Sequence, residues 1–510
     1  MSAPRFYLTT AIDYANGDPH LGHAFEKIGT DVIARYHRLA GYDVHFLTGL
    51  DEHGQKVAQT AADRGVAPQA FVDELAVRFR AMWERLGISF DQFIRTTDAP
   101  HKVGVRALIE RIHERNPDDF YEQAYEGWYC VGCELFKREA EIVDGRCVTH
   151  PTRELVWTQE KNFFFRLTRY AAFLRDRITT HARFLRPESR RNEMLALLDQ
   201  GLEDLSITRS RLTWAIPFPL ASSSGEQQGT WVWFDALPNY LTATGFPDAG
   251  FEARWPAQLH VVGKDINRLH SIVWPAMLQA AGLPLPEQVW VHGFVNLGGE
   301  RFSKSAGVKL ELGEAIDRFG VDAFRYFLMR EVPFDADGNF SWERFEERYN
   351  ADLANAWGNL ASRTLAMIEK YHGGTVPSAP PTALDAQDLA DYDAYHAAMD
   401  GRNGYLLHEG LKAIWSTVAR GNEYVDRQAP WKLAKDPALA DELAATMAAL
   451  ARHLARQCVA VAPFMPTKAA ELWAALGAPS SLGDQRFADL VSLDCTGWRV
   501  SKGAAMFPKG

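Results

Sequence analysis

The chain has 510 residues, of which 47% are hydrophobic and 24% are charged. This composition is typical of a globular protein and excludes a largely disordered chain. No segment holds the roughly 20 apolar residues that span a bilayer, and residues 1–14 lack the pattern of a secretion signal; we therefore expect a cytoplasmic protein with no membrane partner. The net charge of −10 argues weakly against a nucleic-acid partner. The length predicts three or more compact units.

The chain begins with a strand–helix–strand pattern. Residues 6–12 form an apolar run that predicts a strand, and apolar residues at helical spacing follow over residues 21–39. A second apolar run at residues 44–49 completes a βαβ unit. Ligands of such sheets bind at the carboxyl ends of the strands, where Tyr14 and Asp51 lie. Asp51 could meet an ammonium group there or serve as an ordinary helix cap.

A turn joins the first strand to the first helix. Residues 15–23 read Ala-Asn-Gly-Asp-Pro-His-Leu-Gly-His, in which Asp18 is a candidate helix cap. His20 and His23 then lie one turn apart at the helix N-terminus, where backbone N–H groups and the helix dipole favour an anion. Gly22 lets a flat ring or backbone approach closely. The turn predicts a nucleotide phosphate site, although His-x-x-His by itself is more often a chance pair or half of a metal site.

A cysteine-containing segment interrupts the α/β pattern after predicted helices at residues 68–86 and 102–115. Two short pairs, Cys-x-x-Cys and Cys-x-x-His, flank a hairpin-like stretch at residues 135–146. Such pairs converge on one tetrahedral ion, and four protein ligands leave no open position, so we expect a structural zinc. Five cysteines in this arrangement do not make a disulfide framework. The predicted ligands are Cys130, Cys133, Cys147 and His150.

The α/β pattern resumes near residue 230. Residues 229–235, 259–263 and 288–293 predict further strands, and a helix after the second of them carries His270 and Trp274 on one face. The sequence therefore predicts a parallel α/β sheet that is split by an insertion of about 115 residues.

Glycines bracket an Arg-Phe-Ser-Lys-Ser segment after the last predicted strand. Lys304 lies between two serines there, and a mobile loop with one lysine suits phosphate, although an exposed Ser-Lys-Ser could equally be a plain surface turn. From residue 342 to residue 477 the pattern is helical and predicts a bundle. The predicted units are the first half of the α/β domain at 1–115, the insertion at 116–228, the second half of the α/β domain at 229–296, a linking segment at 297–349 and the helical domain at 350–510.

Taken together, these motifs resemble the methionyl-tRNA synthetases of class I, of the bacterial type with a single zinc knuckle. The resemblance covers nearly the whole chain. It implies a split Rossmann catalytic domain, a zinc-containing connective insertion, a lysine loop and an anticodon-binding helical bundle. Besides the zinc knuckle, it rests on residues 11–23, 48–54, 233–240, 263–266, 292–295, 301–305, 359–363 and 428–431.

The resemblance implies that methionine is activated with ATP to methionyl-adenylate and transferred to tRNA(Met), with Mg²⁺ accompanying ATP. His20, His23 and Lys304 are the implied catalytic residues, and Gly22, Gly263 and Asp265 join them at ATP. The implied methionine site comprises Ile12, Tyr14, Asp51, Trp233, Ala236, Leu237, Tyr240, His270 and Trp274. The implied anticodon readers are Asn359, Arg363, Pro430 and Trp431. For each aromatic residue, ordinary core packing is the alternative.

Four positions depart from the family pattern: Asp13, Pro238, Arg301 and Phe302. Two other functions remain open at this stage. A nucleotidylyltransferase would also use a His-x-Gly-His turn, but the zinc insertion and the helical bundle argue against it. A non-catalytic tRNA-binding or partner-binding paralogue would normally have lost His20, His23 or Lys304. We expect a monomer.

Overall fold

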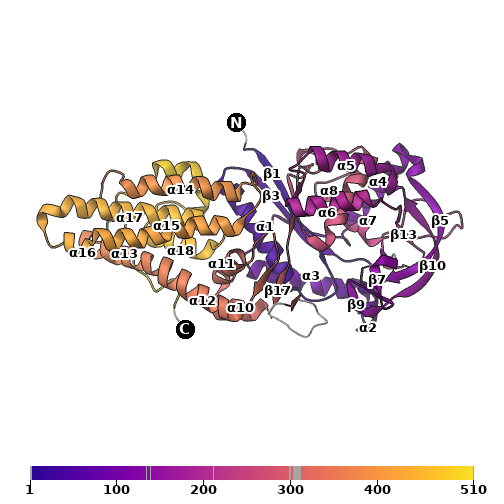
Figure 1. Ribbon diagram of the computed structural model, residues 1–510, viewed down its shortest axis with the longest axis horizontal. Helices are drawn as coiled ribbons and strands as arrows, with labels where there is room; N and C mark the ends of the chain where they lie inside the picture. Colours follow the sequence, from indigo (N-terminus) through magenta and orange to yellow (C-terminus); the bar gives the residue numbers. More distant parts are fainter. Residues whose placement is uncertain are drawn as a thin grey trace.

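The protein is described from a computed structural model that covers residues 3–133, 135–137, 139–210, 212–297, 300–301 and 312–508. Figure 1 shows three parts along the long axis: an α/β body in the middle, an arm of long strands at one end and a helical bundle at the other. None of the described helices is long and apolar enough to cross a membrane.

A parallel sheet forms the centre of the α/β body, in the order β11-β16-β15-β1-β3-β2, with β4 also beside β3. Strands from both halves of the sequence meet side by side in it, since β1 pairs with β3 on one side and with β15 on the other. The predicted split sheet is thereby confirmed. The sequence did not predict β11, an edge strand from within the inserted region. The strands are β1 (Arg5–Thr10), β2 (Asp13–Tyr14), β3 (Asp43–Asp51), β4 (Gln92–Arg95), β11 (Leu185–Arg186), β15 (Leu259–Gly263) and β16 (Val289–His292).

Helices cover the sheet. Helix α1 buries Phe25, Ile28 and Val32 in the core, as its helical spacing predicts. The helices predicted over residues 21–39, 68–86 and 102–115 are confirmed, with small shifts at their ends. The helices of the α/β body are α1 (Leu21–Leu39), α2 (Gln55–Asp63), α3 (Pro68–Arg85), α4 (Ala99–Arg115), α7 (Val232–Ala236), α8 (Asn239–Thr242) and α9 (Trp274–Ala281).

The prediction of a strand over residues 229–235 is wrong beyond Thr230. Only β14 (Gly229–Thr230) is extended, and the chain turns into α7 directly afterwards. Val232, Phe234, Asp235 and Ala236 of this short helix are all buried. Because the helix has almost no exposed face, its sequence lacks the polar stripe by which a helical period is recognised.

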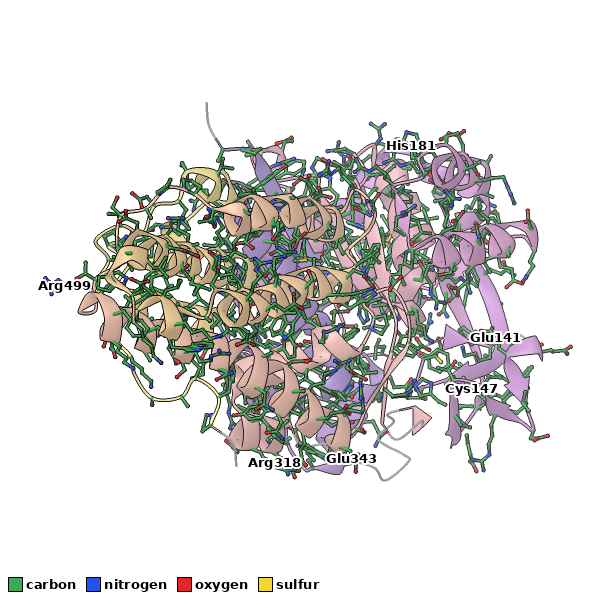
Figure 2. The ribbon with its side chains drawn as sticks, turned by 60° about the vertical axis from the view of Figure 1, so that its left-hand side comes forward. Glu141, Cys147, His181, Arg318, Glu343 and Arg499 are labelled. Atoms are coloured by element: carbon green, nitrogen blue, oxygen red, sulfur yellow. The ribbon has the colours of Figure 1, made fainter. Side chains whose placement is uncertain are left out.

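The inserted region is built on a long antiparallel ribbon of β5 and β10 (Figure 1). Short strands at its end form the cysteine knuckle, where Figure 2 places Cys147 and Glu141. The strands are β5 (Phe120–Cys130), β6 (Leu135–Phe136), β7 (Ile142–Val143), β8 (Arg146–Cys147), β9 (His150–Glu154), β10 (Val156–Phe165), β12 (Leu205–Ser206) and β13 (Thr208–Arg209); the helices are α5 (Ala171–Thr180) and α6 (Glu188–Asp199).

The rest of the chain is mainly helical, as predicted. A small sheet of β17 (Val295–Leu297), β18 (Glu300–Arg301) and β19 (Gly338–Phe340) lies at its start. The linking helices are α10 (Leu312–Phe319), α11 (Val321–Glu331) and α12 (Trp342–Arg348). The bundle consists of α13 (Asn359–His372), α14 (Ala383–Met399), α15 (Leu407–Gln428), α16 (Pro430–Leu433), α17 (Ala440–Val461) and α18 (Pro466–Ala475).

Candidate active site

Two stacked histidines open helix α1 at the carboxyl edge of the sheet. His20 is the N-cap, and its Nδ1 accepts the Gly22 N–H at 3.2 Å. His23 Nδ1 accepts the His20 N–H at 3.3 Å, and the two ring centroids are 3.7 Å apart. Because both Nδ1 atoms are acceptors, each neutral ring carries its proton on Nε2. The helix therefore presents two imidazole N–H donors at its positive end, which suits an anion.

The prediction that Asp18 caps helix α1 is wrong. Helix α1 starts at Leu21, two residues beyond Pro19, so that His20 occupies the capping position. Asp18 is exposed and instead accepts a 2.7 Å hydrogen bond from Arg78 on α3. An imidazole nitrogen thus takes the place of the usual carboxylate or hydroxyl cap.

The second candidate ATP region lies at the end of β15, which is the neighbour of β1 in the sheet. Gly263 ends β15 and is in register with His292 at the end of β16. A Cβ on Gly263 would lie 2.8 Å from Oδ1 of Asp265, so glycine lets this carboxylate fold back over the strand end. Asp265 is exposed at the start of the following turn. Ligands of parallel sheets bind at such carboxyl ends.

The candidate methionine residues gather around a buried hydrogen bond. Tyr240 Oη lies 2.7 Å from His270 Nε2, and His270 Nδ1 lies 3.0 Å from the Ile266 carbonyl oxygen. A carbonyl only accepts, so His270 donates from Nδ1 and accepts the tyrosine proton at Nε2. Burial lowers the pKa of His270 to about 4, which keeps the ring neutral at physiological pH.

Apolar side chains surround this pair. The Trp233 ring meets that of His270 edge-on at 6.3 Å, and the Trp274 ring lies 6.2 Å from that of Tyr240. Leu237 is buried in the same core cluster, Ile12 and Tyr14 pack against that cluster, and Ala236 is 3% exposed. The wall is aromatic and aliphatic, which suits an uncharged thioether.

Asp51 lies beside these residues at the end of β3. It is in register with Tyr14 of β2, and its carbonyl accepts the Ala15 N–H at 2.8 Å. Asp51 is 5% exposed. The following helix α2 is capped by Gly54, so the alternative that Asp51 is a helix cap is wrong.

Sequence reasoning missed a buried His–Asp–His set behind this wall. Asp235 of α7 accepts from His53 Nδ1 at 2.6 Å and from His101 Nε2 at 2.9 Å. His53 follows Asp51 closely in the chain, so the carboxylate ties the strand end to the helix that carries Trp233. Burial raises the pKa of Asp235, but the two histidines outweigh it and the net pKa is lowered. The sequence around Asp235 does not predict this contact, because both histidine partners are more than 130 residues away in the chain.

The cysteine cluster forms as predicted. The ligand atoms of Cys130, Cys133, Cys147 and His150 all lie within 4.8 Å of one another. The Cys133 and Cys147 sulfurs are 3.6 Å apart, and Cys130 Sγ is 3.9 Å from His150 Nδ1. Ligands of a tetrahedral zinc, with bonds of about 2.3 Å, stand roughly 3.8 Å apart. The cluster therefore fits a zinc ion closely. A Cβ at Gly132 would lie 2.7 Å from the His150 ring, which explains the glycine between the first two cysteines.

The candidate anticodon residues come together at the far end of the bundle. Asn359 and Arg363 lie one turn apart on α13, and Arg363 donates to Asp426 near the end of α15 at 2.7 Å. Helix α16 follows directly, with buried Pro430 and a Trp431 side chain that is 40% exposed. Figure 1 shows α13 and α16 together there, away from the sheet.

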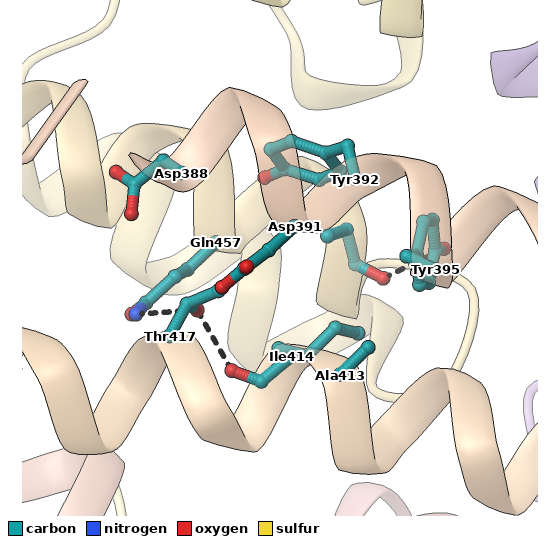
Figure 3. Close-up of a pocket in the computed structure, with 9 residues that line it drawn as sticks. Asp388, Asp391, Tyr392, Tyr395, Ala413, Ile414, Thr417 and Gln457 are labelled. Atoms are coloured by element: carbon teal, nitrogen blue, oxygen red, sulfur yellow. Dashed lines mark hydrogen bonds between the residues drawn. The ribbon is translucent and has the colours of Figure 1, made fainter. Parts of the chain in front are cut away.

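Lys304 and Phe302 lie outside the described residues, as does the rest of the lysine loop between residues 302 and 311. Pro238 is the N-cap residue of α8 and is next to Leu237. A cavity of about 10 Å³ lies elsewhere, between α14, α15 and α17 (Figure 3). Its walls include Asp388, Thr417 and Gln457, and it has room for about one water molecule. It contains none of the candidate site residues.

Comparison with known proteins identifies the family. The model of class I tRNA synthetases (M) matches residues 6–154 and 138–365, and the anticodon-binding domain of methionyl tRNA ligase matches residues 373–509. The methionine–tRNA ligase of Thermosynechococcus vestitus is 41% identical, over 95% of this chain and 94% of its own length. The chain belongs to the methionyl-tRNA synthetase family.

Further relatives agree with this assignment. The methionine–tRNA ligase of Streptomyces coelicolor is 40% identical, over 99% of this chain and 97% of its own. The structure of Mycobacterium tuberculosis methionyl-tRNA synthetase in complex with methionyl-adenylate superimposes with a TM-score of 0.92 at 40% identity, covering 99% of this chain and 100% of that one. As a methionyl-tRNA synthetase, the protein is a class I methionine–tRNA ligase.

Proposed function

We propose that the protein joins methionine to tRNA(Met) in two steps at the carboxyl edge of its central sheet. A methionine carboxylate oxygen attacks the α-phosphorus of ATP, and pyrophosphate leaves. The 2′-hydroxyl of the terminal adenosine of tRNA then attacks the carbonyl carbon of the adenylate, and AMP leaves. The reactants carry their own nucleophiles, so the protein contributes positioning and charge stabilisation.

The observation that carries this proposal is the paired cap of helix α1. Two imidazole rings stack at the positive end of this helix with both Nδ1 atoms used as acceptors, which leaves their Nε2–H groups as donors suited to phosphate. In the proposed site Gly22 permits close approach of the nucleotide, and Gly263 with Asp265 receives the ribose. Lys304 would add the positive charge of its ammonium group to the phosphates, and Mg²⁺ accompanying ATP would neutralise part of their negative charge.

The methionine side chain enters the aromatic cluster, and Asp51 takes the ammonium group. A neutral Tyr240–His270 pair suits this task. The methionine side chain carries no charge, so it could not compensate the free-energy cost of burying an ionised group beside it. The lining residues are Ile12, Tyr14, Trp233, Ala236, Leu237, Tyr240, His270 and Trp274.

The knuckle has a very small hydrophobic core of its own. A zinc ion would cross-link and stabilise it, bound by Cys130, Cys133, Cys147 and His150. Asn359, Arg363, Pro430 and Trp431 read the anticodon, since unstacked RNA bases are recognised by stacking and by hydrogen bonds to base edges. The five predicted units stand as proposed domains, and the protein acts as a monomer in the cytoplasm.

Methionine-dependent ATP–pyrophosphate exchange tests the function. The expected result is exchange with methionine that far exceeds exchange with leucine, isoleucine or valine, followed by charging of tRNA(Met). Activity with another amino acid but not with methionine would overturn the specificity. Exchange that never leads to charged tRNA would instead support a nucleotidylyltransferase. Replacing Lys304→Ala should slow adenylate formation and leave methionine binding nearly unchanged.

A further inference from the structure

A fully buried lysine lies one turn after the histidine pair on helix α1. The Lys27 side chain is 0% exposed. Its Nζ donates 2.8 Å hydrogen bonds to the Ala11 carbonyl, to Asp13 Oδ1 and to Glu26 Oε1. An ammonium group has three N–H donors, so all of them are used. Burial lowers the pKa of Lys27, but the two carboxylates outweigh it and raise the net value, which keeps the group charged.

The contact to Ala11 acts on the backbone at the proposed methionine site. Ala11 follows β1, and its N–H donates to the Val261 carbonyl of β15 at 3.1 Å. Its carbonyl accepts from both Lys27 and Thr10 Oγ1, the latter also at 2.8 Å. Because a trans peptide is planar, fixing the Ala11 carbonyl also fixes the direction of the Ile12 N–H in the same plane. Ile12 belongs to the proposed methionine site.

The contact to Glu26 leads towards the nucleotide side. Glu26 Oε2 lies 3.0 Å from His292 Nε2, and His292 Nδ1 lies 2.7 Å from the Gly293 carbonyl oxygen. His292 ends β16 in register with Gly263. A continuous chain of buried polar contacts therefore runs from the Ala11–Ile12 peptide through Lys27 and Glu26 to the strand end beside the proposed ribose position.

We propose that Lys27 is a positioning residue that holds the Ala11–Ile12 peptide in the geometry required for methionine binding. Asp13, which departs from the family pattern, is its counter-ion. This inference rests on the proposed function. A merely structural ion pair would lower stability when removed without changing the affinity for one substrate, whereas a positioning role raises the KM for methionine specifically.

The test measures pyrophosphate exchange by the wild-type protein and by a double variant that carries both Asp13→Asn and Lys27→Met. This variant removes both charges of the pair and leaves Glu26 with His292, so no isolated charge from the pair stays buried. Loss of a hydrogen bond from a charged donor predicts a KM for methionine raised by about tenfold, with the KM for ATP within about threefold of wild type. A methionine KM within twofold of wild type would overturn the inference.

The matched control is Asp385→Asn with Arg452→Met, which removes a buried ion pair of 2.8 Å in the helical bundle. It should lower the unfolding midpoint without changing either KM. If the Lys27 double variant does not fold, Thr10→Val decides, because it removes the other donor to the Ala11 carbonyl and changes the side-chain shape little. A methionine KM raised about threefold would support the proposal that the fixed Ala11 carbonyl positions the methionine site, and a wild-type KM would contradict it.

Failure of this inference is distinguishable from failure of the proposed function. A wild-type protein without methionine-dependent exchange would overturn the function itself. An active wild-type protein whose Lys27 variants retain the wild-type KM would overturn only the role of Lys27.

Discussion

A Cβ atom on residue 22 would lie 3.2 Å from Cε1 and 3.3 Å from Nδ1 of His20. Both distances are shorter than ordinary van der Waals contact, so any side chain at Gly22 displaces the imidazole by a few tenths of an ångström. Gly22 also donates its N–H to that same ring. The glycine therefore sets the position of the first proposed catalytic histidine as well as leaving room for the nucleotide.

Gly22→Ala should slow pyrophosphate exchange by about tenfold or more, because the His20 ring is moved out of its stacked geometry. Alanine is the better helix former, so the unfolding midpoint should stay constant or rise. Steady-state exchange kinetics and thermal unfolding check the two effects separately. Wild-type exchange in a folded variant would show that the His20 position is not critical.

His20→Asn separates capping from catalysis. Asparagine is a good N-cap and can still accept the Gly22 N–H, so stability should stay within about 1 kcal/mol of wild type. The imidazole Nε2–H is lost, and adenylate formation should fall by about 100-fold. His20→Ala is the comparison that should lose both properties. Adenylate formation at the wild-type rate in His20→Asn would remove His20 from the mechanism.

The neutral His270 predicts a pH dependence of stability. Its folded pKa of about 4 lies below the value of about 6.5 expected in the unfolded chain. Between these values the unfolded state binds the proton and the folded state does not, so stability falls as the pH falls from about 6.5 towards 4. His270→Gln removes this contribution.

Urea unfolding of wild type and of His270→Gln, at about pH 7.5 and about pH 5, measures the effect. The wild-type protein should lose about 2 kcal/mol more than the variant between these two conditions. An equal loss in both proteins would show that His270 titrates normally in the folded state.

Trp431→Ala should impair tRNA charging and spare adenylate formation. The side chain is 40% exposed at the end of the bundle, where a base could stack on it. Stacking on an aromatic side chain is worth about 1–3 kcal/mol per base, so the KM for tRNA should rise by about tenfold or more. Leu439→Ala, at another exposed apolar position of the bundle, is the control and should leave charging unchanged. A wild-type KM for tRNA in the tryptophan variant would contradict the anticodon role.

Cys133→Ser should remove zinc from the protein. The proposed zinc site uses all four side chains of the cluster, so the loss of one thiolate should strongly reduce its affinity for zinc and loosen the knuckle. The zinc content measured by metal analysis should fall from about one ion per chain to near zero. Amide hydrogen exchange should become faster in strands β7 to β9. The central sheet should keep its protection. Cys458→Ala, at a buried cysteine of the bundle, should retain full zinc content.

Several features were predictable because they are local in sequence. The apolar periods of β1, α1 and β3, the paired spacing of the cysteine cluster and the order of the family motifs each depend on neighbouring residues. The split of the sheet also followed from the change of pattern near residues 116 and 229. The short helix α7 did not follow, since a helix buried on nearly every face has no polar stripe.

The turn at residues 15–23 shows where sequence alone determined the outcome. Two histidines after a proline, with a glycine between them, predict an anion site at a helix start, and their placement at the N-terminus of α1 agrees. Which residue caps the helix was decided by the folded backbone, which assigns this position to His20 and leaves Asp18 to Arg78.

Only the tertiary structure could join residues that are remote in the chain. Asp235 meets His53 and His101, and His292 meets Glu26, across more than 130 residues in each case. A buried carboxylate must find partners wherever the fold brings them, so no sequence period records the pairing. The sequence determined the family, the split sheet and the cysteine–histidine cluster; the fold determined which buried charged and polar groups meet across the chain.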